Sequence, residues 1–369
     1  MSSTLSILVL AGDPGGGAAL VPVLQQLISK QKTNVHVYAY RQSANLFRQQ
    51  KIPFGELTET TTIDDCRSLL DRHRPRVILT ATSVNGIDLE KKLIAAAQEA
   101  HIPSLAVLDF WTNYRARFEN EHRQLIFLPD RIAVMDQRAV TEMGKLGFPV
   151  NQLIITGQPA LDRFIRVPQK ERLAIRARLR EQLKLTSQDH LIVFISQNIE
   201  DAYQDLMSPE DPGYTEKSVF KWLLNQILTL KKEGGCNSFA ILIKPHPCER
   251  EDSWTDILAQ SDLVTVDRLN DTHDLAVAAD QVIGMYSIAL IECALLGCLV
   301  VSFQPDRVSP PKDIIKHFPG IDTVTNEGEL LSLVRVNMLK PQTHLTPEKT
   351  PTIKTATSIV THELLCLIK

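Results

Sequence analysis

The chain has 369 residues, of which 44% are hydrophobic and 22% charged, and its formal net charge is −3. This length exceeds one ordinary domain and predicts two. The charge balance gives no reason to expect general binding of nucleic acid. No apolar run reaches the roughly 20 residues that cross a bilayer, and the first apolar segment lacks the flanks of a signal peptide, so we expect a cytoplasmic protein. The six cysteines form no C-x-x-C pair, which predicts free thiols.

Strands and helices are predicted to alternate along the first part of the chain. Residues 5–13 (LSILVLAGD) are a short apolar run that ends in a Gly/Pro loop, as a buried strand does. Continuous apolar runs separated by helices are typical of a parallel sheet covered on both faces. Strands are expected at 5–13, 34–40, 75–83, 103–111, 130–136 and 151–157, and helices at 17–31, 63–74 and 88–102.

The alternation pauses at 161–190, a charged stretch with helical spacing that we interpret as the link to a second domain. It resumes at 191. Two successive α/β units predict two Rossmann-like, doubly wound parallel-sheet domains facing one cleft, residues 1–165 and 166–350. Strands are expected at 191–198, 238–247, 262–267, 280–287 and 298–305, and helices at 217–234, 271–279, 288–297 and 352–369.

Parallel α/β sheets bind ligands beyond the carboxyl ends of their strands, so polar residues there are the candidates for a site. The first strand ends in AGDPGGGAAL, where Gly15 and Gly16 let the backbone approach a ligand and open a helix whose N-terminus favours anions. The spacing is neither G-x-G-x-x-G nor a Walker loop, and a tight turn is the alternative. Asp13, at the same strand end, is a candidate general base.

The strand at 103–111 leads into the loop LDFWTNYRARF. Asp109 is a second candidate base there. Aromatic rings beside polar groups suit the faces of a sugar, and arginine can hold phosphate. The alternative is a surface loop anchored by one tryptophan. The candidates for binding an acceptor are Trp111, Asn113, Tyr114 and Arg115.

The segment IKPHPCERED follows the strand at 238–247. Two prolines stiffen the loop, so Lys244 and His246 project from a fixed backbone and can donate to phosphate oxygens. A purely structural histidine is the alternative. No second His or Cys has the spacing of a zinc ligand, so we expect no metal.

The segment GMYSIALIECALLG (284–297) places a hydroxyl and a carboxylate in an apolar run. Ser287 is the expected N-cap of a helix whose first amides favour a diphosphate. Glu292 has apolar neighbours, and a carboxylate there is costly without a partner, which ribose hydroxyls would supply. The alternative is a polar stripe that faces water. Gly284, Ser287 and Glu292 are therefore candidates for nucleotide binding.

This order of strand, Ser, helix with one Glu, Gly and strand resembles the nucleotide-sugar site of GT-B fold glycosyltransferases and of the related non-hydrolysing UDP-N-acetylglucosamine 2-epimerases. IKPHP resembles a KPHP loop of the same superfamily, and IITGQPALDRF (154–164) resembles the segment that closes its first domain. The resemblance implies that Glu292 holds the donor ribose and that Ser287, the helix amides and His246 hold the diphosphate. It also implies that the C-terminal helix, within 351–369, crosses back to the first domain.

The sequence departs from this pattern in two respects. The epimerases carry additional acidic and histidine residues in their first-domain cleft, for which we find no counterpart. Gln158 stands where Asn is common.

The leading prediction is a metal-independent glycosyltransferase that moves a sugar from a UDP-type donor to a glycan or lipid-linked acceptor in surface polysaccharide synthesis. Lys244, His246 and the helix at Ser287 would stabilise the departing diphosphate, and Asp13 or Asp109 would activate the acceptor. Three alternatives stay open. They are an epimerase-like enzyme, a polyol-phosphate or sialyl-type transferase with a CDP or CMP donor, and a non-catalytic nucleotide-binding protein. No cofactor is expected.

The segment 163–180 interleaves arginines and lysines with apolar residues. This pattern is compatible with peripheral contact with anionic lipid at the inner face of a membrane. A solvated interdomain helix is the simpler interpretation.

Overall fold

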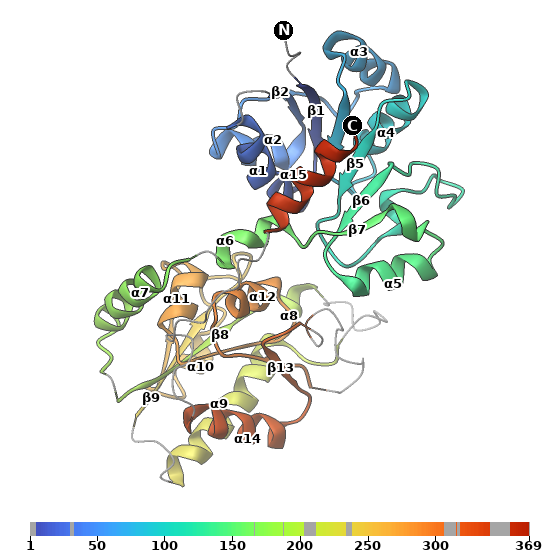
Figure 1. Cartoon of the computed structure of the whole chain (residues 1–369). Helices are drawn as coiled ribbons and strands as arrows, with labels where there is room; N and C mark the ends of the chain where they lie inside the picture. Colours follow the sequence, from blue (N-terminus) through green and yellow to red (C-terminus); the bar gives the residue numbers. More distant parts are fainter. Residues whose placement is uncertain are drawn as a thin grey trace. The chain divides into compact units, whose positions relative to one another are not determined.

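The computed structural model describes residues 5–29, 33–165, 167–186, 188–202, 212–233, 238–305, 315, 318–339 and 355–368. The chain forms two units, residues 1–162 with 351–369 and residues 163–350 (Figure 1). Each unit contains one parallel sheet with flanking helices. The predicted fold class, two Rossmann-like α/β domains, is therefore confirmed.

Unit 1 is built on a seven-stranded sheet in the order β3-β2-β1-β4-β5-β6-β7. All of its pairings are parallel, and β1 pairs with β2 and with β4. The first strand is central because both of its faces are apolar and Ile7, Leu8 and Val9 are fully buried. The elements are β1 (Leu5–Ala11), α1 (Pro14–Ile28), β2 (Thr33–Ala39), α2 (Arg41–Gln49), β3 (Gly55–Glu56), α3 (Ile63–His73), β4 (Val77–Thr80), α4 (Leu89–Glu99), β5 (Ser104–Val107), β6 (Arg131–Val134), α5 (Gln137–Lys145), β7 (Leu153–Ile155) and α15 (Ala356–Cys366).

The C-terminal helix α15 belongs to unit 1 and packs against α1. Its buried Val360 and Leu364 join the core under α1 and β1. Its first turn is held by the buried Asp162, whose carboxylate accepts from the amide of Ala356 at 3.1 Å and from the amide and hydroxyl of Thr357 at 2.8 and 2.6 Å. A carboxylate at a helix N-terminus also interacts favourably with the helix dipole.

Unit 2 repeats the same architecture with six parallel strands in the order β10-β9-β8-β11-β12-β13. Its core is centred on the ring cluster of Phe194, Phe220 and Trp254, whose edges meet faces at centroid distances of 5.1–6.2 Å. The elements are α6 (Asp162–Ile165) at the start, α7 (Gln169–Gln182), β8 (His190–Ile195), α8 (Ile199–Ala202), α9 (Glu216–Lys232), β9 (Phe239–Lys244), α10 (Thr255–Leu258), β10 (Val264–Val266), α11 (Thr272–Ala278), β11 (Gln281–Gly284), α12 (Ile288–Leu295), β12 (Val300–Phe303), β13 (Ile321–Val324) and α14 (Glu327–Leu339).

Arginines of α7 are used inside unit 2. Arg176 is buried, donates to the carbonyls of residues 277–279, and pairs with Asp280 at 2.5 Å, while Arg180 pairs with the other carboxylate oxygen at 3.1 Å. These contacts fix α7 on α11. Two of the cations in 163–180 that were expected to contact lipid are therefore paired within unit 2.

Candidate functional site

The carboxyl edge of the unit 1 sheet brings the glycine loop and Asp109 together. A Cβ atom added to Gly15 would lie 2.2 Å from Oδ2 of Asp109, and one added to Gly16 would lie 2.7 Å from Cβ of Ala81. Both glycines are thus required by close packing of the start of α1 against the ends of β4 and β5. The two candidate segments, distant in sequence, share one edge as predicted for parallel strands.

Asp109 is engaged in a buried ion pair. Nη1 of Arg117 lies 2.5 Å from its Oδ1, and the same nitrogen donates to the Thr82 hydroxyl at 2.8 Å. Burial raises the pKa of Asp109, although the charge of Arg117 acts against that rise. Gln158 donates to the Asp109 carbonyl at 2.7 Å, so the segment 154–164 is tied to the same strand end.

Asp13 is held by neutral donors. The Val84 amide donates to one carboxylate oxygen at 3.0 Å and the Asn85 side chain to the other at 2.7 Å. Asn85 also donates to the Tyr40 hydroxyl at 3.1 Å, and this hydroxyl donates to the buried Glu90 at 2.7 Å. A chain of hydrogen bonds thus links Asp13 to a carboxyl group within unit 1.

Glu90 is the buried end of that chain. The Ser83 hydroxyl donates at 2.8 Å to Oε2, the oxygen that also accepts from Tyr40, while Oε1 has no hydrogen-bond partner among the residues that the structure describes. Burial raises the pKa of Glu90, which hydrogen bonds from Tyr40 and Ser83 only partly oppose. Burial and the charge of Glu90 likewise raise the pKa of Tyr40. A neutral carboxyl group suits such a dry setting.

Three of the four predicted acceptor-binding residues are used within unit 1. Trp111 is buried and donates to Asp136 at 2.7 Å, and Tyr114 is buried and donates to Glu142 at 3.0 Å. Nη1 of Arg115 donates to the Leu146 carbonyl at 2.7 Å. Asn113 is exposed, with φ of +58°. The aromatic rings therefore anchor the loop, and sugar contact by these residues stays a prediction.

In unit 2, Glu292 has a histidine partner that the sequence did not reveal. Nε2 of His273 lies 2.7 Å from Oε2 of Glu292, and the two side chains are 24% and 18% exposed. His273 lies in the first turn of α11 and Glu292 in α12. The carboxylate is therefore stabilised by an imidazole in the structure, which satisfies the expected need for a partner.

The start of α12 matches its predicted geometry. Ser287 is the N-cap and accepts from the Ala289 amide at 3.3 Å. A Cβ atom on Gly284 would lie 3.0 Å from the Ile195 carbonyl, so glycine permits β11 to pass closely along β8. This eight-residue helix begins directly after the carboxyl end of β11, so its first turn lies at the carboxyl edge of the sheet.

Lys244 and His246 lie in a loop of fixed shape at the end of β9. Nζ of Lys244 donates to the Asn270 carbonyl at 2.6 Å. Glu249 accepts from the His246 amide at 2.9 Å and from the Trp254 indole at 2.6 Å. His246 Nδ1 accepts from the Cys248 amide at 3.3 Å, which leaves Nε2 as the nitrogen that carries a proton in the neutral ring.

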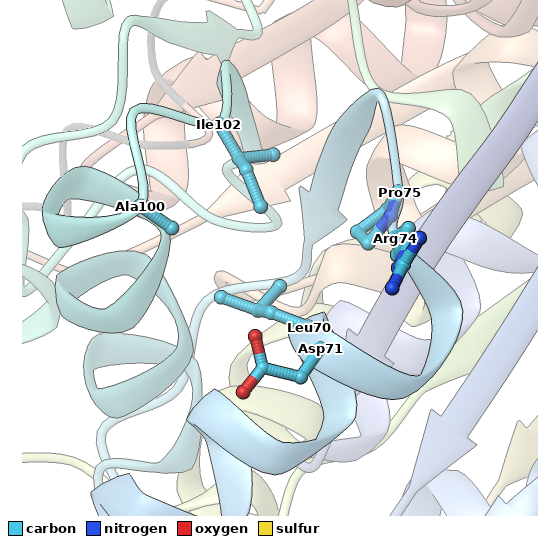
Figure 2. A pocket seen from close by; sticks show the side chains of 6 residues that line it. All are labelled: Leu70, Asp71, Arg74, Pro75, Ala100 and Ile102. Carbon is cyan, nitrogen blue, oxygen red and sulfur yellow. The ribbon is translucent and has the colours of Figure 1, made fainter.

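A pocket of about 390 Å³ lies at the opposite edge of the unit 1 sheet (Figure 2). It is lined by Leu70, Asp71, Arg74, Pro75, Ala100 and Ile102, from the ends of α3 and α4 and the segments that lead into β4 and β5. It lies at the amino ends of those strands and contains none of the candidate residues. The residues described include no group of His, Cys, Asp and Glu that could hold a metal, and no helix among them is long and apolar enough to span a bilayer.

Comparisons with protein-family models and with curated proteins gave no match. Solved structures are similar over the full length. The chain resembles UDP-GlcNAc 2-epimerase from Neisseria meningitidis bound to UDP-GlcNAc, with 14% identity, a TM-score of 0.67 and coverage of 98% of this chain and 100% of that one. The Methanocaldococcus jannaschii UDP-GlcNAc 2-epimerase matches with 12% identity, a TM-score of 0.66 and the same coverage. Anabaena Alr3699/HepE in complex with UDP matches with 12% identity, a TM-score of 0.59 and coverage of 99% and 97%.

These likenesses show the fold. The chain has the two-domain Rossmann-like architecture of the GT-B type that the UDP-GlcNAc 2-epimerase structures share, as the resemblance of its motifs predicted.

Proposed function

We propose that the chain is an enzyme that binds a UDP-type nucleotide-sugar and inverts the configuration of the sugar at C2. The observation that carries this proposal is the full-length likeness to UDP-GlcNAc 2-epimerases, one of them bound to UDP-GlcNAc. Glycosyl transfer, which the sequence analysis placed first, shares the fold, but the similar structures favour the epimerase-like alternative.

Unit 2 is the proposed nucleotide side. Glu292 binds the ribose hydroxyls, because a half-buried carboxylate at the carboxyl edge of a parallel sheet can accept from both. Ser287 and the first amides of α12 bind the diphosphate through the positive end of the helix. Lys244 and His246 add donors from the end of β9, which β8 separates from β11 in the same sheet.

Epimerisation at C2 requires a base that removes the C2 proton, so that the electron pair of the C2–H bond forms a C1=C2 double bond as UDP leaves C1 with the electrons of the C1–O bond. An acid then returns a proton to the other face of C2 as UDP adds back to C1. Unit 1 offers the carboxylates of Asp13 and Asp109, both at the carboxyl edge of its sheet. Asp109 is balanced by Arg117, whereas Asp13 accepts only from the Val84 amide and the Asn85 amide. Asp13 is thus the better candidate base.

The test incubates the full chain with UDP-GlcNAc in D₂O without an acceptor and follows the C2 proton by NMR. We expect a second epimer and deuterium at C2. Glu292→Gln should raise KM with little change in kcat, because it weakens ribose binding. Glu181→Gln, an exposed carboxylate of α7, is the matched control and should behave as the unmodified chain. Binding of UDP-GlcNAc with neither epimer nor exchange contradicts the proposal.

A second candidate is glycosyl transfer, as first predicted. It is favoured by the absence, among residues that we can place, of the additional acidic and histidine residues that epimerases carry in the first domain. It predicts no epimer, and consumption of the nucleotide-sugar only when a glycan or lipid-linked acceptor is added. A thermal-shift preference for CDP or CMP would favour the polyol-phosphate or sialyl-type alternative. Tight binding without turnover on any acceptor would favour the non-catalytic one.

A further inference from the structure

His273 is held between two carboxylates at the carboxyl edge of unit 2. Its Nε2 lies 2.7 Å from Oε2 of Glu292 in α12, and its Nδ1 lies 3.0 Å from Oδ1 of Asp271, the N-cap of α11. An imidazole that donates through both nitrogens is the protonated form. Two carboxylates that face both ring nitrogens favour the protonated ring, and one of them is the carboxylate that the proposed function assigns to ribose.

Aromatic packing shields this pair. The Phe164 ring lies 4.5 Å from the His273 ring, centroid to centroid, and the guanidinium of Arg163 lies 4.4 Å from the Phe164 centroid. Burial lowers the pKa of His273, but the hydrogen bond and charge of Glu292 and the charge of Asp271 outweigh it, and the pKa is raised. Arg163 acts in the same direction as burial.

The other charged groups near the pair leave Glu292 as the deciding partner. On α7, which packs against α11, Arg178 is paired with Asp274 at 2.7 Å. In α12 the thiol of Cys293 is buried and its pKa is raised well above the ordinary value, chiefly by burial, so it stays neutral. Without Glu292, burial and Arg163 would lower the pKa of His273, and of the two carboxylates only Asp271 would still raise it.

We propose that nucleotide binding exchanges His273 for the ribose hydroxyls on Glu292 and thereby releases a proton to solvent. A bidentate contact with a ribose diol uses both carboxylate oxygens, and His273 already contacts one of them at 2.7 Å, so the ring and the diol compete for that oxygen. Once displaced, the ring keeps the cost of burial but loses its main anion, and its proton leaves. This inference rests on the proposed binding of a nucleotide-sugar to unit 2.

The sign of the pH dependence follows from that exchange. Below the pKa of His273 in the free protein, the imidazolium competes with ribose. As pH rises toward and through that pKa, fewer protons are released for each nucleotide bound, and the affinity for the nucleotide increases. Linkage of one proton gives a slope of about tenfold in affinity per pH unit between the His273 pKa values of the bound and free states. A fixed neutral side chain at position 273 removes the slope.

The experiment is titration calorimetry of the full chain with UDP-GlcNAc from pH 5.5 to 8.5, in buffers of different ionisation enthalpy. The diester diphosphate of this probe has no group that titrates near neutrality, so the proton count reports the protein. We expect proton release in the unmodified chain, none in His273→Gln, and an affinity for that variant that is flat with pH. His122→Gln, on an exposed histidine of unit 1, is the control and should release as many protons as the unmodified chain.

Binding without proton release, or equal release by His273→Gln, overturns this inference and leaves the proposed function intact. Absence of nucleotide binding in the unmodified chain overturns both. An NMR titration of His273 in Glu292→Gln checks the pair without ligand. The pKa of His273 must fall relative to the unmodified chain, and an unchanged value also overturns the inference.

Discussion

Gly15→Ala tests how tightly the glycine loop and Asp109 are packed in unit 1. The new Cβ atom would lie 2.2 Å from Oδ2 of Asp109, about 1 Å inside normal contact, so the carboxylate must move. That carboxylate is paired with Arg117 at 2.5 Å, and their side chains are 12% and 5% exposed. Breaking a buried pair costs about 3–5 kcal/mol, whereas replacing a helical glycine by alanine returns about 1 kcal/mol. The net loss expected is about 2–4 kcal/mol.

The assay is urea unfolding followed by the fluorescence of Trp111, the tryptophan of unit 1. Gly144→Ala in α5 of unit 1 is the matched control, because the nearest atom to its added Cβ is a methyl group of the exposed Val150 at 3.3 Å, which can move aside, so its stability should change little. In an Asp109→Ala background, Gly15→Ala should cost almost nothing further, since the clashing group is gone. A Gly15→Ala variant as stable as the unmodified chain would refute the reasoning.

Three other predictions concern single groups. Burial raises the pKa of Glu90 in the folded chain, so Glu90 ionises at a lower pH in the unfolded chain. The free energy of unfolding therefore falls as pH rises above the pKa of an exposed glutamate. Glu90→Gln should remove that loss, so the urea midpoint of the variant should exceed that of the unmodified chain more at pH 8 than at pH 5. Arg176→Ala should lower the free energy of unfolding of unit 2 by about 3–5 kcal/mol, because it removes a donor from a buried carboxylate and from three carbonyls. Arg178→Ala, in an exposed ion pair, should lower it by less than about 1 kcal/mol. Equal losses in urea unfolding would contradict this prediction. Asp13→Asn should abolish turnover and lower the unfolding midpoint modestly, because one of the two N–H donors to Asp13 would then face the new amide nitrogen. Asp109→Asn should lower that midpoint further because Arg117 loses its anion. An active Asp13→Asn enzyme would exclude this residue as the base.

Much of the fold was predictable because parallel strands are buried on both faces. The apolar runs at 5–13 and 191–198 became the central strands β1 and β8. Elements with few apolar residues were not predicted, since their hydrophobic periodicity is weak. α2 (RQSANLFRQ) buries only Ser43, Ala44 and Phe47, and β3 has two residues. α5, β13 and α14 were also not predicted.

The sequence predicted where the candidate site lies better than it predicted which side chains pair with each other there. Strand ends pointed to Asp13 and Asp109, because ligands of such sheets bind there, and a lone carboxylate in an apolar helix pointed to Glu292. The residues that complete each group come from elsewhere in the chain. His273 carried no signal beyond lying near the start of a short helix, and Glu90 lies in the charged first turn of the helix expected at 88–102, where the sequence did not mark it as buried. Side-chain pairing across elements depends on register and crossing geometry, which a single sequence does not encode in its periodicity.

The three carboxylates differ in what a ligand must displace to reach them. Asp109 is neutralised by a buried guanidinium, so a substrate group that took its place would leave Arg117 without an anion. Glu292 is balanced by an imidazolium that can shed its charge, so exchange with a neutral diol leaves no buried cation behind. Asp13 accepts from two neutral amides, so a group that took its place would leave no cation without a partner. Asp109 is thus suited to a structural role, Glu292 to reversible binding and Asp13 to proton transfer.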